Sequence, residues 1–180
     1  MSHLMPRLAR RGAGLGVACA LAGAALVFPA APAQASRAPI TSDEQDYYSY
    51  YYLGQLHASG YTGRGVTIGL LDGPVNTNIP ELQGANIQYM SRCDVESSED
   101  SWEHGTVIAQ MISAPEFGIA PEARLNRYTV SLKGDTPSRD CAIGWWDHGY
   151  SETSVLIELA LNDGVDIITM SSTYSADTES

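Results

Sequence analysis

A short apolar run that ends in a single acid most constrains the fold of this chain. Residues 66–71 read Val-Thr-Ile-Gly-Leu-Leu, with glycines just before them. Such a run predicts a strand that is buried on both faces, as in a parallel sheet. Asp72 follows the run, and Gly73-Pro74 then turns the chain. Parallel α/β sheets place ligands and catalytic groups at the carboxyl ends of their strands, although Asp before Gly-Pro is also common turn chemistry.

A second stretch supplies a histidine. Residues 104–112 begin with His-Gly-Thr, and the apolar residues that follow have the spacing of one face of a buried helix. We therefore expect His104 in the first turn of this helix, preceded by an acidic surface loop over residues 94–103. Trp102 in this loop is expected to pack, with a wall for substrate as the alternative. A third stretch, Gly-Ile-Ala-Pro-Glu-Ala-Arg-Leu at residues 118–125, predicts a loop that enters another strand.

These three blocks, in this order, resemble the subtilisin-like serine proteases (subtilases) over about residues 45–175. They match the family's blocks around the catalytic Asp, around His-Gly-Thr and at Gly-Val-Ala-Pro. The resemblance implies that Asp72 and His104 are catalytic members of an Asp-His-Ser triad, with Asp72 orienting the imidazole and His104 acting as general base. The positive end of the helix would disfavour a charged imidazole, and a buried Asp72 would offset this during turnover.

The rest of the chain alternates helices and strands, which predicts an α/β fold with a parallel sheet. The resemblance implies a three-layer subtilisin-like fold with a parallel central sheet, incomplete here at about the first half. The last strand would then be an uncovered apolar edge. We expect tyrosines of the first helix to cover the sheet surface at a domain edge. The expected helices span residues 43–59 and 151–163, and the further strands span residues 86–90, 124–130 and 165–169.

The substrate segment and the nucleophile depart from the family pattern. Thr-Met-Ser-Ser-Thr at residues 169–173 resembles the family's Asn-Met-Ser-Leu-Gly block, which implies substrate binding by Ser171, Ser172 and Thr173. The family's serine lies roughly 150 residues beyond its histidine, and this sequence contains no Gly-Thr-Ser-Met-Ala block. We therefore expect the 180-residue chain to be inactive alone and to need a C-terminal complementing segment.

The N-terminus has the three parts of a secretory signal peptide. A cluster of arginines precedes an apolar core, and Ala-Gln-Ala at residues 33–35 fits the cleavage pattern. We expect a signal peptide over residues 1–35, a linker over residues 36–42 and a partial subtilisin-like peptidase domain over residues 43–180. The expected location is extracellular, with no membrane contact after cleavage. An uncleaved anchor is the alternative, which two prolines near the end of the apolar core disfavour.

Cysteines, acids and net charge limit the possible partners. Cys93 and Cys141 remain after signal removal, and two cysteines in an oxidising compartment most simply form a disulfide, with unlinked thiols as the alternative. No zinc-ligand spacing is present. Subtilases often bind calcium, but the acidic residues 94–103 lack EF-hand spacing, so we expect no required cofactor. A net charge of −11 argues against nucleic acid as a partner.

Two function classes remain open. The presence of both Asp72 and His104 favours an exported serine endopeptidase that hydrolyses peptide bonds in peptide or protein substrates. The missing serine block and the altered residues 169–173 favour the alternative, a non-catalytic secreted pseudoprotease or binding protein, or a truncated remnant.

Overall fold

The computed structural model describes residues 37–91, 94–137 and 151–171. Short 3₁₀ helices span Ser42–Glu44 (η1) and Pro80–Leu82 (η2). The α-helices are α1 (Asp46–Tyr50), α2 (Leu53–Ala58), α3 (Glu99–Ser113) and α5 (Glu152–Asn162). The strands are β1 (Thr67–Asp72), β2 (Ile87–Tyr89), β3 (Val95–Glu96), β4 (Arg124–Thr129), β5 (Thr136–Pro137) and β6 (Ile167–Met170).

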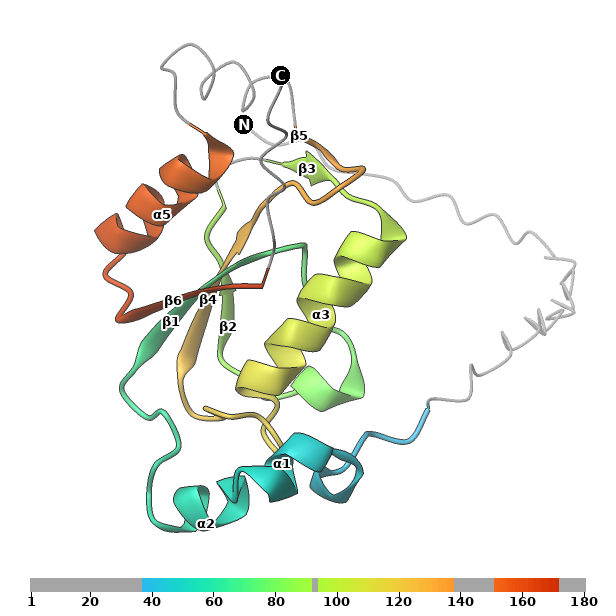
Figure 1. Cartoon of the computed structure of the whole chain (residues 1–180), viewed down its shortest axis with the longest axis vertical. Coiled ribbons are helices and arrows are strands. Elements are labelled where there is room, and N and C mark those ends of the chain that lie inside the picture. Colours follow the sequence, from blue (N-terminus) through green and yellow to red (C-terminus); the bar gives the residue numbers. More distant parts are fainter. Residues whose placement is uncertain (1–36, 92–93, 138–150, 172–180) are drawn as a thin grey trace, which may run out of the picture. The chain divides into compact units, whose positions relative to one another are not determined.

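Four of these strands form the parallel sheet that the sequence predicts. Their order is β2-β4-β1-β6, and every neighbouring pair is parallel (Figure 1). On one side β1 pairs with β4 along its whole length, so that Asp72 lies opposite Thr129. On the other side Leu71 lies opposite Met170 of β6. Because the strands are parallel, their carboxyl ends meet at one edge of the sheet, and Asp72 lies at that edge.

Helices cover both faces of the sheet, which gives the expected three layers (Figure 1). One core contains Leu70 and Leu125 of the sheet together with Ala109 of α3. The other contains Leu71 and Tyr128 of the sheet with Leu156 and Ala160 of α5. The near-complete burial of β1 between these cores explains why its central residues are apolar or glycine.

The expectation of one helix over residues 43–59 is wrong. Helix α1 ends at Tyr50 and α2 begins at Leu53. Between them Tyr52 has φ 54°, in the left-handed region that a residue with a Cβ rarely adopts. This one residue turns the chain and divides the helix in two.

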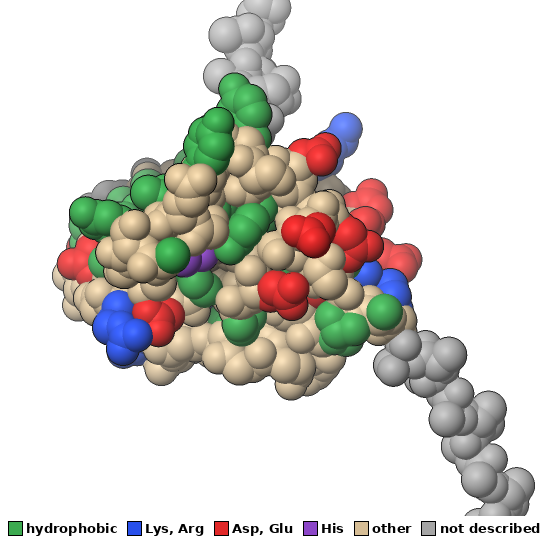
Figure 2. Space-filling view, turned by 90° about the horizontal axis from the view of Figure 1, so that it is seen from below, with side chains coloured by type: hydrophobic (Ala, Val, Ile, Leu, Met, Phe, Trp, Pro, Cys, Tyr) green, Lys and Arg blue, Asp and Glu red, His purple; other side chains and the backbone are tan. Residues whose placement is uncertain are grey.

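The tyrosines of this segment do not cover the sheet, contrary to the prediction. Tyr47 is half-buried and its hydroxyl donates a hydrogen bond to the carbonyl of Phe117. Tyr50, Tyr51 and Tyr52 are exposed. Figure 2 views the molecule from the α1–α2 end, where green hydrophobic side chains lie on the surface among acidic and basic ones.

Strand β6 lies at the edge of the sheet, as expected for the last strand in the described part of the chain. Its Ile167 side chain is 52% exposed, which agrees with the expected uncovered apolar edge. Its start is held to β1 by Asp166, whose carboxylate accepts a hydrogen bond of 2.8 Å from the Thr67 amide. None of the described helices is long and apolar enough to cross a bilayer.

A buried carboxylate fixes the segment that precedes η1. The Glu81 side chain is buried, and its Oε1 atom accepts hydrogen bonds from Arg37 Nη2 at 2.6 Å and from the Ile40 amide at 3.0 Å. Burial alone raises the pKa of Glu81, but these hydrogen bonds and the Arg37 charge outweigh it and hold the pKa below its usual value. The chain from residue 37 is therefore part of the folded domain.

Candidate active site

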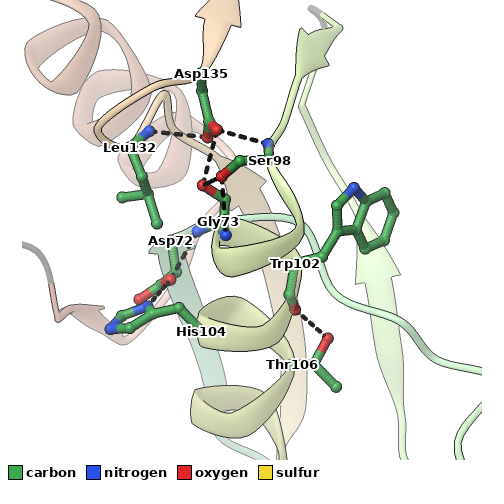
Figure 3. Close-up of polar contacts among 9 residues, drawn as sticks. Asp72, Gly73, Ser98, Trp102, His104, Thr106, Leu132 and Asp135 are labelled. Atoms are coloured by element: carbon green, nitrogen blue, oxygen red, sulfur yellow. Dashed lines mark hydrogen bonds and ion pairs between the residues drawn. The ribbon is translucent and has the colours of Figure 1, made fainter.

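Asp72 presents a carboxylate at the carboxyl edge of the sheet. Strand β1 positions it, and its side chain is fully buried. Its Oδ1 atom accepts a hydrogen bond of 2.7 Å from the Gly73 amide and lies 2.6 Å from His104 Nδ1 (Figure 3). Its Oδ2 atom is buried and has no hydrogen-bond partner among the described residues. A buried carboxylate in this setting is held in one orientation, toward the histidine.

His104 of α3 completes the pair. A carboxylate only accepts hydrogen bonds, so the ring donates from Nδ1, and the neutral imidazole then carries a free lone pair on Nε2. The His104 side chain is 41% exposed, whereas that of Asp72 is inaccessible. The arrangement can therefore accept a proton at Nε2 from a group outside and stabilise the resulting imidazolium through the buried carboxylate.

The expected position of His104 in the first helical turn is wrong. Helix α3 begins at Glu99, after Ser98, whose hydroxyl caps the helix by accepting a hydrogen bond from the Ser101 amide. Residues 99–103 are therefore helical and not a loop, and His104 lies in the second turn. The effect of a helix dipole fades within the first turn. The expected destabilisation of a charged His104 by the positive end of the helix therefore does not apply.

Two glycines allow α3 to approach the end of β1 closely. A Cβ atom on Gly105 would lie 2.2 Å from the carbonyl oxygen of Gly73 and 2.6 Å from that of Pro74. A Cβ atom on Gly73 would lie 2.2 Å from the carbonyl oxygen of Ser101. Side chains at either position would push the helix away from the strand. The close backbone contact thus sets the distance between Asp72 and His104.

Trp102 does not have the first of its two expected roles, because it is not packed in the interior. Its side chain is 44% exposed, and it forms a wall of two neighbouring surface cavities of about 320 and 460 Å³. Both cavities also contact Asn76 of the turn after β1. The backbone carbonyl of Trp102 accepts a hydrogen bond of 2.6 Å from the Thr106 hydroxyl (Figure 3). The smaller cavity is lined mainly by α3, and the larger one mainly by the turn after β1.

Of the other predicted site residues, only Ser171 belongs to the described part of the chain. Ser171 follows β6 and is exposed. Ser172, Thr173, Cys93 and Cys141 lie outside the described residues, so the substrate segment and the disulfide stay predictions. Within residues 37–91, 94–137 and 151–171, no three His, Cys, Asp or Glu side chains are grouped so that they could hold a metal ion.

One residue of this region was not predicted. Asp135, in the loop after β4, accepts hydrogen bonds from three groups, two of which belong to the start of α3 (Figure 3). A lone Asp in a polar loop carries no sequence signal for such a role. Its two partners at the start of α3 are 34 and 37 residues away along the chain, and the pairing of β3 with β5 brings the two segments together.

Comparisons with known proteins agree with this geometry. The model of the Subtilase family matches residues 63–180. Subtilisin E of Bacillus subtilis is 29% identical over 121 residues, which cover 64% of this chain and 29% of Subtilisin E. The Minor extracellular protease Vpr of the same species is 28% identical over 136 residues, which cover 67% of this chain and 16% of Vpr. The chain therefore spans less than a third of the length of either relative.

A solved structure shows the same fold. The serine protease MycP1, described as an essential component of the type VII (ESX-1) secretion system, superimposes with a TM-score of 0.51 at 22% identity. The superposition covers 69% of this chain and 37% of MycP1. At this identity the similarity concerns the fold alone, which is the three-layer arrangement around a parallel sheet.

Proposed function

The chain belongs to the subtilase family, whose characterised members are serine endopeptidases, and we propose that it forms the N-terminal part of such an enzyme. In this proposal Asp72 is the orienting acid and His104 is the general base. The observation that carries it is the 2.6 Å contact between His104 Nδ1 and the buried Asp72 carboxylate, at the carboxyl edge of the sheet. A surface ion pair without a catalytic role would gain little from burying one partner completely.

In the proposed mechanism His104 carries one proton from the attacking serine to the leaving amine. The hydroxyl of a serine outside residues 1–180 attacks the scissile carbonyl, and its proton moves to Nε2 of His104. Asp72 stabilises the imidazolium that forms and keeps the ring in its orientation. The imidazolium then donates the proton to the leaving amine, which releases the first product. A water molecule then attacks the acyl-enzyme in the same way, and His104 again takes up the proton and returns it to the leaving serine. These steps use no metal or cofactor.

The proposed nucleophile and oxyanion hole come from a complementing C-terminal segment, and the substrates are peptides or proteins. We propose export through a signal peptide at residues 1–35, which the word "extracellular" in the name of the relative Vpr supports. The absence of a Gly-Thr-Ser-Met-Ala block supports an inactive isolated chain, because catalysis without the serine retains only a small residual rate.

Peptide hydrolysis by two proteins tests this proposal. One is the chain of 180 residues, and the other extends it with the coding sequence that follows codon 180 in its gene. We expect no hydrolysis by the first, and hydrolysis by the second that is lost in His104→Ala. An extended chain that cleaves peptides equally well with His104→Ala would refute the assignment. An extended chain that folds and never cleaves would refute the proposed catalysis and favour the alternative, a non-catalytic protein.

A further inference from the structure

We propose that Asp135 is a positioning residue for His104, because it ties the first turn of α3 to the loop after β4 and thereby holds the imidazole against Asp72. The inference rests on the proposed role of His104 as general base. It adds a second carboxylate to the description of the site, beside that of Asp72, and this one touches neither substrate nor the reacting atoms.

Asp135 uses both of its carboxylate oxygens. Oδ1 accepts hydrogen bonds of 2.8 Å from the Ser98 amide and from the Ser101 hydroxyl. Oδ2 accepts a hydrogen bond of 3.0 Å from the Leu132 amide, within its own loop. One side chain thus links the N-cap residue and the first turn of α3 to a turn that is fixed by β4 (Figure 3).

Ser101 connects this cluster to the active-site pair. Its side chain is buried, and its hydroxyl also contacts that of Ser98 at 2.9 Å. Its carbonyl lies directly over Gly73, where a Cβ atom would approach it to 2.2 Å. Gly73 in turn donates its amide hydrogen to Asp72. His104 follows Ser101 by three residues, about one helical turn, so both belong to one rigid segment.

The charge of Asp135 matters because all three of its partners donate. Burial raises its pKa, but the hydrogen bonds from the Ser98 amide, the Ser101 hydroxyl and the Leu132 amide outweigh this and lower the pKa below its usual value. An asparagine has one acceptor oxygen and one donor NH₂ group. In either amide orientation, the NH₂ group would face at least one donor. Asp135→Asn therefore removes at least one link while it preserves the size of the side chain.

The alternative is that Asp135 only stabilises the start of the helix. In that case its loss would lower the free energy of unfolding and leave the imidazole unchanged. A positioning role predicts a change at the ring itself, since the Nδ1 proton is held by a single 2.6 Å contact that depends on where α3 lies. The two roles are thus separated by the tautomer of His104.

The ring tautomer can be measured in the 180-residue chain by ¹⁵N NMR of the imidazole nitrogens at neutral pH. The matched control is Asp166→Asn, which alters a carboxylate that likewise accepts a backbone amide, at the opposite end of β1. We expect the Nδ1–H tautomer in the unaltered chain and in Asp166→Asn. In Asp135→Asn we expect a shift toward the Nε2–H tautomer that free imidazole side chains favour.

A folded Asp135→Asn chain that keeps the Nδ1–H tautomer would overturn the inference, as would an equal shift in Asp166→Asn. If Asp135→Asn does not fold, Ser101→Ala removes one of the same links and decides the question by the same readout. None of these signals needs turnover. A complemented enzyme that fails to cleave peptides would therefore refute the proposed function and leave the measured tautomers unchanged. An unchanged tautomer in Asp135→Asn would refute the positioning role and leave the proposed function in place.

Discussion

Replacing Gly105 by alanine sets helix propensity against packing. In a helix interior alanine is more favourable than glycine by about 1 kcal/mol. The new Cβ atom, however, would lie 2.2 Å from the Gly73 carbonyl oxygen, where ordinary contact begins at 3.4 Å. Both neighbours are backbone carbonyls, so no rotamer change can relieve the overlap. Overpacking then costs about 3 kcal/mol, the upper end of its usual range, and the net loss of stability is about 2 kcal/mol.

Urea denaturation of the two chains measures this difference in the free energy of unfolding. The control is Gly54→Ala in α2, where the Cβ atom would meet only the ring of Tyr48 at 3.4 Å. There the propensity gain has no steric cost, and we expect a stabilisation of about 0.5–1 kcal/mol. The two substitutions are chemically identical, so their opposite signs isolate the contact between α3 and the end of β1.

A Gly105→Ala chain as stable as the original, with an unchanged dependence on urea, would refute the reasoning. It would mean that α3 is not held against the strand by this contact, and that the distance between Asp72 and His104 is set elsewhere. Destabilisation by Gly54→Ala would show that α2 is not an ordinary helix at that position.

Three further outcomes follow from the charges and burial of single side chains. Arg37→Ala should lower the free energy of unfolding by about 1.5–3 kcal/mol, because its partner Glu81 is buried. Arg64→Ala breaks an exposed pair of equal length and should cost less than about 1 kcal/mol. Equal losses of the two variants in urea denaturation would contradict this. The pKa of Asp135 is lowered in the folded chain, so its ionised carboxylate stabilises the fold fully well above pH 3.8, the ordinary pKa. This stabilisation is lost as the pH falls through the lower pKa of the folded state. The difference in the free energy of unfolding between the original chain and Asp135→Asn should therefore disappear in acid. Burial raises the pKa of Tyr128 from 10.0 to about 12, so its stabilising effect should be present below pH 10 and decline toward pH 12, and an absorbance titration in which all tyrosines ionise together near pH 10 would exclude this.

The sequence predicts most of the sheet and the pair at its edge. The apolar run of β1 between glycines, the acid that ends it and the His-Gly-Thr of α3 each carry a local signal, and the topology follows from the alternation of helices and strands. The start of α3 carries a signal as well. Ser98, followed by Glu99 and Asp100, is a typical N-cap with an acidic first turn, but the density of charge favoured a loop.

Other features have no local signal. Tyr52 adopts a left-handed conformation that its residue type disfavours, so the sequence gives no warning of it. The position of Asp135 depends on the antiparallel pairing of β3 with β5, two strands of two residues each. Strands this short leave no periodicity to detect, and their partners are distant in sequence. The links that hold the site together are therefore less predictable than the residues that they hold.

The pairing of β1 also has a consequence during protein synthesis. The strand that bears Asp72 emerges from the ribosome before either of its neighbours, and its bond to Asp166 closes a loop of 99 residues. At about 5–20 residues per second, translation leaves β1 without β6 for about 5–20 s. Such distant parallel pairing is also slow to form once the chain is complete. Strand β1 is deeply buried in the finished fold, and among the described strands it is therefore also the one whose apolar side chains wait longest for their partners during synthesis.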